Sequence, residues 1–192
     1  MLFPFSVVRE HQKDFLNDIK HAVENGRHLI ANAPTGLGKT AASLSPALEY
    51  AIDNGKTVFF LTPRHSQHQI AIETLKKLRE KSETNFQIAD IIGKKWLCSV
   101  KNVEDMTSSD FSDFCNSMVR EERCRFYENT RNKDRALKGS ALDALKIVQG
   151  NFYHAEEAKS MLASEHCSYE IIMELAKQSR VIIADYYHLF SP

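Results

Sequence analysis

The segment "ANAPTGLGKTAAS", residues 31–43, constrains the fold of this chain more than any other stretch. It follows a short apolar run, "HLIANA", and leads into "KTAASLSPALEYAIDNG", which has the pattern of a helix that Gly55 closes. A glycine-rich turn between a strand and a helix directs backbone N–H groups and the helix N-terminus toward a phosphate. The segment therefore predicts an α/β domain with a nucleotide loop. The alternative is an ordinary turn in which Gly-Lys-Thr occurs by chance.

The loop follows the pattern G-x-x-x-x-G-K-[ST], except that Ala33 occupies the first position. In this pattern the lysine reaches the β- and γ-phosphates and the hydroxyl binds Mg²⁺, so Lys39 and Thr40 are the predicted catalytic residues. Glycines let the backbone approach the phosphates closely. The predicted nucleotide-binding residues of the loop are Thr35, Gly36, Leu37, Gly38, Lys39 and Thr40.

Helix and strand patterns alternate over the first 93 residues, which is typical of an α/β domain with a parallel sheet. The runs "REHQKDFLNDIKHAVENG" and "SQHQIAIETLKKLREK" predict helices, and "HLIANA", "TVFFLTP" and "FQIADIIG" predict strands. Pro46 predicts a kink or local break in the helix after the nucleotide loop. The side chains expected on one face of the first helix are Phe15, Ile19, Ala22 and Val23, and those expected to face inward from the later one are Ile70, Thr74, Leu75 and Leu78.

The pattern changes after Gly93, because no strong strand signal occurs from Lys94 to about Ser168. Helical patterns cover "DRALKGSALDALKIVQG", "HAEEAKSMLASEH" and "SYEIIMELAKQS", and "RVIIADY" then predicts a buried strand. We interpret residues 94–170 as a mainly helical insertion into one α/β domain, which residues 1–93 and 171–192 form.

All four cysteines lie in this insertion, with the spacing Cys98-x16-Cys115-x8-Cys124-x42-Cys167. No C-x2-C pair occurs, so the spacings of zinc fingers and zinc ribbons do not match. Four thiolates are also the ligand set of a [4Fe–4S] cluster. The spacing alone leaves three interpretations open: an iron–sulfur cluster, a distributed zinc site and four unrelated thiols.

Two polar segments are candidates for contact with nucleic acid. "TPRHSQ", residues 62–67, follows a predicted strand, and ligands gather at the carboxyl ends of such strands. Thr62 and Arg64 can meet a backbone phosphate there, and the alternative is a polar loop with a helix cap at Ser66. The basic run "RNKDRALK", residues 131–138, either faces a DNA backbone or is the solvated start of a helix.

Composition adds little about partners, because Lys+Arg and Asp+Glu both total 25. No run of 18 apolar residues occurs, so no transmembrane helix is expected. The first residues, "MLFPFSVVREHQ", lack the layout of a signal peptide. We therefore expect an intracellular protein without a membrane partner, in which disulfides are not the role of the cysteines.

Several motifs, in chain order, resemble those of one family. "FPFSVVREHQ" resembles its aromatic-Pro and R-x-x-Q opening, "APTGLGKT" its nucleotide loop, and "VFFLTPRHSQHQ" its motif Ia. "GKKWLC", "CRFYENT" and "CSYE" resemble the segments around its cluster-binding cysteines, and "VIIADYYHLFSP" resembles the segment that follows. Over almost its whole length the chain thus resembles the XPD/DinG group of iron–sulfur superfamily 2 DNA helicases, most closely the archaeal XPD members.

The resemblance implies an incomplete RecA-like (P-loop) motor domain 1 with an inserted, mainly α-helical iron–sulfur cluster domain. Its cofactors would be ATP, Mg²⁺ and a [4Fe–4S] cluster. A glutamine side chain offers a donor and an acceptor, which suits an adenine edge. By resemblance, Arg9 and Gln12 recognise adenine, Thr62 and Arg64 contact single-stranded DNA, and Cys98, Cys115, Cys124 and Cys167 bind the cluster.

For a full-length protein the resemblance implies ATP-dependent unwinding of DNA, 5′ to 3′, in DNA repair. Single-stranded or forked DNA and repair-complex proteins would be its partners, and it would act as a monomer in the cytoplasm or a eukaryotic nucleus. The family's D-E-A-H box has no counterpart, because no Asp-Glu dipeptide occurs in the 192 residues. We therefore expect an N-terminal fragment that does not unwind DNA alone. The alternatives are a non-catalytic nucleotide- or DNA-binding module and a zinc-stabilised P-loop domain.

Overall fold

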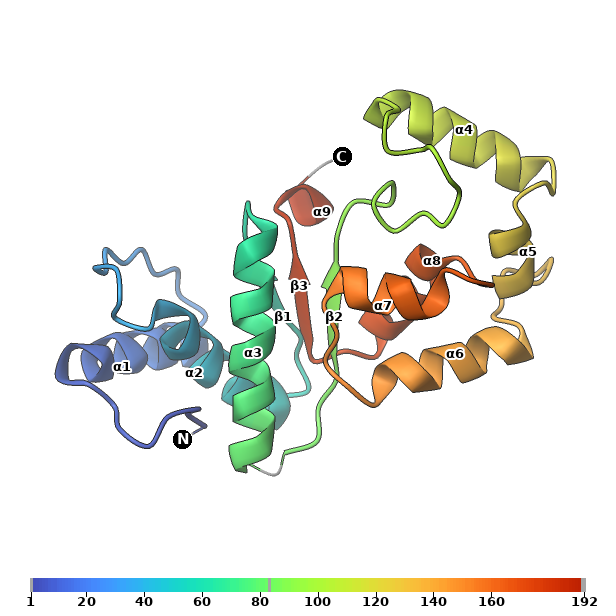
Figure 1. The fold of residues 1–192 in the computed structure, drawn as a ribbon. Coiled ribbons are helices and arrows are strands. Elements are labelled where there is room, and N and C mark those ends of the chain that lie inside the picture. The colour runs from blue at the N-terminus through green and yellow to red at the C-terminus, as the bar shows by residue number, and fades with distance from the viewer. Residues whose placement is uncertain (1, 83, 191–192) are drawn as a thin grey trace. The chain divides into compact units, whose positions relative to one another are not determined.

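The computed structural model describes residues 2–82 and 84–190, whose helices and strands are drawn in Figure 1. The chain divides into two compact units. Unit 1 comprises the described residues up to Ile88 and from Ser179 onward, and unit 2 comprises Ala89–Gln178. Unit 1 contains the predicted nucleotide loop, and unit 2 contains all four cysteines. The interpretation of residues 94–170 as an inserted cluster domain stays a prediction.

Unit 1 has a mixed α/β fold with a small parallel sheet. Its strands β1, Val58–Leu61, and β3, Val181–Ala184, pair in parallel with Val58 opposite Val181. β3 lies between β1 and β2, Ile88–Ile91, which begins in unit 1 and continues into unit 2. Both β2 and β3 are buried along their whole length, which is typical of apolar strands in parallel sheets. The predicted α/β class is therefore confirmed. The predicted runs "TVFFLTP", "FQIADIIG" and "RVIIADY" each contain one of the three strands.

The helices of unit 1 are α1, Glu10–Glu24, α2, Lys39–Asp53, α3, His65–Ser82, and the short α9, Tyr187–Phe190. α1 packs on α2 through Leu16, which is buried in a cluster with Ala41 and Ala42. This contact fixes the start of α2, where the predicted nucleotide loop ends. The predicted helices on either side of the loop are therefore confirmed.

α2 runs through Pro46 without a break, and the flanking Leu44 and Leu48 are fully buried; a kink at Pro46 stays a prediction. One expectation about these helices is wrong. Ile70 is not a core residue, because half of its surface is exposed. The buried residues of α3 are His68, Ala71, Ile72, Thr74, Leu75 and Leu78.

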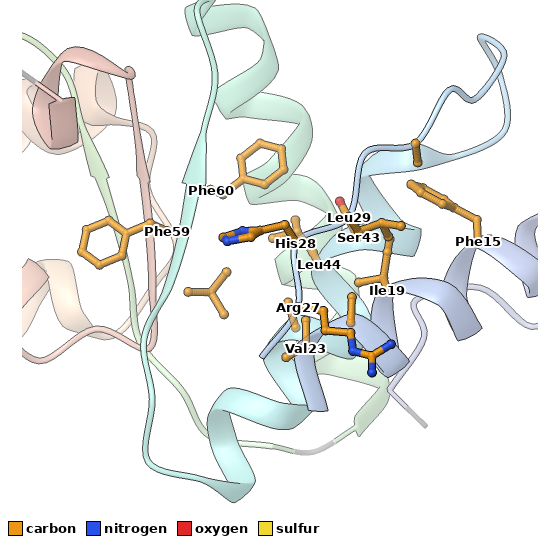
Figure 2. A pocket seen from close by; sticks show the side chains of 14 residues that line it. Phe15, Ile19, Val23, Arg27, His28, Leu29, Ser43, Leu44, Phe59 and Phe60 are labelled. Atoms are coloured by element: carbon orange, nitrogen blue, oxygen red, sulfur yellow. The ribbon is translucent and has the colours of Figure 1, made fainter. Parts of the chain in front are cut away.

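The predicted strand at "HLIANA" is also wrong, because this segment has no regular secondary structure and belongs to no sheet. A groove of about 540 Å³ separates it from β1, and Figure 2 shows His28, Leu29 and Phe60 among the side chains that line this space. The backbone groups of the segment therefore find no strand partner among the described residues, and Ile30 is fully exposed. Phe15, Ile19 and Val23 of α1 are partly buried and line the same groove.

Unit 2 is mainly helical. Its helices are α4, Ser108–Arg120, α5, Arg125–Thr130, α6, Gly139–Gln149, α7, Ala155–Leu162, and α8, Ser168–Lys177. α8 packs against α5, α6 and α7, and Ile171 and Ile172 on its inner face are buried. The helical character predicted for this part is confirmed. None of the helices in the described part of the chain is long and apolar enough to span a membrane.

Candidate nucleotide and metal sites

The predicted nucleotide loop leads directly into α2. Gly36 and Gly38 both have a positive φ, 84° and 81°, which is the left-handed region that glycine adopts without steric cost. Gly38 is the residue before the first turn of α2, and Lys39 and Thr40 are the first two residues of that helix. The loop and the helix N-terminus thus have the arrangement that binds phosphate in nucleotide loops.

Arg9 and Gln12, which resemble adenine-recognition residues, contact this loop. Arg9 Nη1 donates to the Gly36 carbonyl oxygen at 2.8 Å, and Gln12 Nε2 donates to the Leu37 carbonyl oxygen at 3.0 Å. Gln12 is buried, and its Oε1 accepts from the Arg9 N–H at 3.3 Å. A Cβ atom on Gly38 would lie only 2.6 Å from Gln12 Nε2. The first turn of α1 therefore holds the loop, and only glycine fits at its last position.

Lys39 is folded back onto its own loop. Its Nζ donates to the carbonyl oxygens of Ala33 at 3.1 Å and Pro34 at 2.9 Å. The side chain is exposed, so a phosphate can replace both carbonyl acceptors without a change in the loop core. Thr40 is partly buried, and Thr35 is exposed at the tip of the loop.

The predicted DNA-contacting residues Thr62 and Arg64 lie just after β1 but differ in exposure. Thr62 is buried, and its hydroxyl donates to Gln67 Oε1 and accepts from the Arg64 N–H at 3.4 Å. The Arg64 side chain is exposed. Thr62 therefore holds the backbone of this turn, and Arg64 is the one of the two whose side chain is free to reach a phosphate.

Sequence reasoning missed a polar cluster near this turn. Asp185 follows β3, and its two carboxylate oxygens lie 3.6 Å from His65 Nε2 and 3.5 Å from His68 Nε2. The two imidazole rings are 5.5 Å apart. The signal in the sequence was that His65 and Asp185 each come shortly after a predicted strand, since ligands gather at the carboxyl ends of such strands.

The four cysteines of unit 2 line one cavity. They come from three helices and one loop, because Cys115 lies within α4, Cys124 and Cys167 precede α5 and α8, and Cys98 lies in the loop after β2. No disulfide joins them. The remaining wall contains apolar and aromatic residues, one serine and one lysine: Val100, Phe111, Val119, Phe126, Tyr127, Tyr169, Ser99 and Lys94.

Hydrogen-bond donors point at several of the sulfurs. The backbone N–H groups of Val100 and Glu170 donate to the thiols of Cys98 and Cys167, and Lys94 contacts Cys115. Lys94 also lies over the ring of Tyr169, with Nζ 5.1 Å from the ring centre. Sequence reasoning did not single out Lys94, although it occurs in the "GKKWLC" motif.

Burial is the main influence on the pKa of two of the thiols, those of Cys98 and Cys167. It raises the pKa of Cys167 to about 12, and it raises the pKa of Cys98 despite the hydrogen bond from Val100. For Lys94, burial is the largest single influence and lowers the pKa, but Cys115, Glu170 and Cys167 together outweigh it, so the pKa is raised overall. Metal binding would therefore have to release protons from buried thiols.

The four thiols are the donor set of an iron–sulfur cluster, but the free volume of the cavity, about 20 Å³, is room for about one water molecule and not for a cluster. Thiolates are the protein ligands of [4Fe–4S] clusters, N–H donors stabilise their sulfurs, and a lysine offsets the negative charge. In the part of the chain that the structure describes, no three His, Cys, Asp or Glu side chains are grouped as they would be around a metal ion. The four cysteines nevertheless line one cavity, although the first and the last of them are 69 positions apart in sequence.

The comparisons with known proteins agree with the motifs. The DEAD_2 family model matches residues 60–192. A probable ATP-dependent helicase of Methanocaldococcus jannaschii is 39% identical over 100 residues, which are 52% of this chain and 15% of that protein. The XPD helicase subunits of the general transcription and DNA repair factor IIH from Dictyostelium discoideum and Schizosaccharomyces pombe are each 22% identical. Those two matches cover 99% and 100% of this chain but only 26% and 27% of the relatives.

The family model covers more than half of the chain, and the relatives carry helicase names. The chain therefore belongs to the DEAD_2 family of XPD-like helicases.

Proposed function

We propose that this chain is the nucleotide- and cluster-binding part of an ATP-dependent DNA helicase of the XPD type, which acts in DNA repair. The observation that carries the proposal is the convergence of four widely spaced cysteines on one cavity in a chain that also has the nucleotide loop. Neither a chance Gly-Lys-Thr turn nor four unrelated thiols accounts for both features together.

In this proposal, unit 1 binds ATP with Mg²⁺. Lys39 would exchange the carbonyl oxygens of Ala33 and Pro34 for phosphate oxygens, and Thr40 would provide the hydroxyl for Mg²⁺. Arg9 and Gln12 already hold the loop from outside, so they can bring the base and the phosphates into one arrangement. Arg64, together with the turn that Thr62 holds, would contact single-stranded DNA.

The cysteine cavity of unit 2 would have to widen to hold the [4Fe–4S] cluster. Cys98, Cys115, Cys124 and Cys167 would be its four ligands, and Lys94 would offset its charge. When bound, the cluster would supply four iron–sulfur bonds that cross-link three helices and a loop. The cluster domain would then be rigid enough to separate strands at a DNA fork.

Metal analysis of anaerobically purified protein tests the cluster. We expect about four iron and four sulfide per chain, and Cys124→Ser should lose them. Zinc in place of iron would instead support the zinc-stabilised P-loop domain.

Nucleotide binding by fluorescence titration should weaken about 10-fold or more in Lys39→Ala, because a phosphate partner is lost.

The activity itself is tested on the complete gene product and on this chain separately. We expect the complete protein to displace a DNA strand with ATP, 5′ to 3′, and the 192-residue chain to bind nucleotide without unwinding DNA. Strand displacement by the complete protein that persists in Lys39→Ala would contradict the proposal. Binding without turnover by the complete protein would favour the non-catalytic module.

A further inference from the structure

Arg131 is a buried cation between α5 and α8 of unit 2. Its Nε lies 2.8 Å from Glu170 Oε2, its Nη2 lies 2.7 Å from Glu174 Oε1, and its Nη1 donates to the Arg135 carbonyl oxygen at 2.8 Å. Only 9% of the Arg131 side chain is exposed, against 18% for Glu170 and 16% for Glu174. The basic run that begins at Arg131 therefore does not present this residue to DNA, which corrects that part of the sequence-based expectation.

This network joins the two helices that Cys124 and Cys167 precede. Cys124 precedes α5, of which Arg131 is the C-terminal cap, and Cys167 precedes α8, which carries both carboxylates. The guanidinium group is a rigid planar fork, so an arginine that binds two carboxylates and a carbonyl at once restricts both the distance and the orientation of the groups it joins. The ion pairs therefore set how α5 and α8 lie side by side, and with them the backbone positions of the two cysteines.

Neutral hydrogen bonds reinforce the same junction. The Cys167 N–H donates to Thr130 Oγ1 at 2.8 Å and to the Phe126 carbonyl oxygen at 3.1 Å. The Thr130 hydroxyl donates to the same Phe126 carbonyl at 2.7 Å, and Thr130 is fully buried. None of these bonds involves a sulfur atom, so they are present whether or not a metal is bound.

Cys115 has no comparable support. Its helix α4 buries only Phe111 among its residues, and the rest of the helix is partly or fully exposed. Local stability follows buried contact, so α4 is expected to open more easily than α5 and α8. The four ligands thus differ in how firmly the protein itself holds them.

We propose that Arg131 is a positioning residue, which through Glu170 and Glu174 holds Cys124 and Cys167 in place before the metal binds. The inference rests on the proposed cluster function. It adds an order to assembly: Cys124 and Cys167 form a prepared half of the site, and α4 brings Cys115 to it when the metal arrives.

The test needs a variant that removes the network without leaving a buried charge unpaired. Arg131→Met alone would leave two partly buried carboxylates without their shared cation, which is destabilising for reasons unrelated to the cysteines. The combination of Arg131→Met, Glu170→Gln and Glu174→Gln removes all three charges. Lys177→Met is the matched control, because Lys177 pairs with Glu174 at 2.7 Å but is itself largely exposed.

The first readout is the alkylation rate of each cysteine in metal-free protein, measured by mass spectrometry. In the triple variant we expect Cys124 and Cys167 to react about 10-fold faster than in the unmodified chain, with little change at Cys98 and Cys115. Lys177→Met should react like the unmodified chain. The second readout is iron loss to a chelator, which should be about 10-fold faster in the triple variant, as for other residues that support metal ligands.

Each outcome separates the alternatives. Equal acceleration at all four cysteines would mean general destabilisation and would overturn the inference, as would no change at any of them. If the triple variant does not fold, hydrogen exchange in the unmodified metal-free chain decides: residues 125–131 and 168–174 must be better protected than 108–120. Failure of the unmodified chain to bind iron would overturn the proposed cluster, and the alkylation pattern would still decide the role of Arg131.

Discussion

Gly38 is the residue at which the nucleotide loop and α1 constrain each other most. Its φ of 81° disfavours any side chain, and a Cβ atom there would meet Gln12 Nε2 at 2.6 Å. Gln12 is buried and bonded to the Leu37 carbonyl, so it cannot move away without losing that bond. The glycine that sequence reasoning assigned to phosphate approach thus also allows the contact between α1 and the loop.

Gly38→Ala should therefore lower the free energy of unfolding of unit 1 by more than the roughly 1–2 kcal/mol of a left-handed alanine. Gly55→Ala is the control, because Gly55 also has a positive φ of 63° but nothing lies within 4 Å of its Cβ position. Chemical denaturation of both variants measures the difference. In a Gln12→Ala background, Gly38→Ala and Gly55→Ala should lower the free energy of unfolding by nearly the same amount. An equal cost in the unmodified background would show that Gln12 does not restrict this position.

Glu174 gives unit 2 a predictable response to acid. Burial raises the pKa of Glu174, but its ion pairs with Lys177 and Arg131 outweigh burial and keep the pKa below its usual value of 4.5. Because the folded pKa is below the unfolded one, the stabilisation is complete above pH 4.5 and is lost as the pH falls through the folded pKa. The ion pairs should thus stabilise unit 2 at neutral pH and not in strong acid.

We expect Glu174→Gln to be less stable than the unmodified metal-free chain at neutral pH, and this gap to close below pH 4.5. Urea unfolding monitored by Trp96 fluorescence measures it, because Trp96 is the single tryptophan and lies in unit 2. Asp143→Asn is the control: Asp143 pairs with Lys146 at 2.9 Å, but both side chains are 73% exposed. Its effect should be small at every pH. If the stability difference between Glu174→Gln and the unmodified chain grew in acid, the lowered pKa of Glu174 would be contradicted.

Single elements were predictable where their determinants are local. The helices α1, α2 and α3 follow from apolar spacing, with a glycine just after α1 and α2, and the buried strands β2 and β3 follow from β-branched runs. The segment at residues 28–33 has an apolar run like that of a strand, but it pairs with no strand among the described residues, and a strand forms only as one of a pair. A local sequence pattern does not predict which distant segments pair. The same holds for the contact between Arg131 and Glu170, which are 39 residues apart.

The unpaired segment carries its own prediction. In the 192-residue chain, backbone N–H groups of residues 28–33 should exchange with solvent far faster than those of Val58 and Thr62, which donate to the Arg180 and Ala184 carbonyls at 2.9 and 3.1 Å. Hydrogen exchange with mass spectrometry measures both. Ile30→Ser should change the free energy of unfolding by less than about 0.5 kcal/mol, since the side chain is fully exposed. Slow exchange at residues 28–33 would mean that the segment is paired in solution.

The candidate sites were predictable to different degrees for the same physical reason. The nucleotide loop is one contiguous segment, so its residues could be named from a pattern. The cysteines could be identified as candidate ligands, but their spacing did not predict that they meet in one site. The spacings of 16, 8 and 42 residues match no local metal motif. Their meeting in one cavity, and the place of Lys94 in its wall, depend on how α4, α5 and α8 pack.

At the scale of the whole molecule, the two compact units should respond differently to loss of metal. The four proposed ligands all lie in unit 2, whereas unit 1 has its own core around Leu16, Ala41 and Ala42. A metal that binds only the folded state of one unit stabilises that unit by mass action and leaves the other unchanged. The stability of unit 2 should therefore depend on iron, and that of unit 1 should not.

Cys124→Ser tests this division, because it removes one ligand that the junction of α5 and α8 positions. We expect loss of iron and of the visible absorbance of the cluster, together with a lower urea midpoint for Trp96 fluorescence. Hydrogen exchange in α3 and β1 should stay as in the iron-loaded chain. Chelator-treated unmodified protein is the control. It should have the same urea midpoint as the variant, since serine and a cysteine without bound metal differ by one atom. Parallel destabilisation of α3 and β1 would mean that the two units unfold as one.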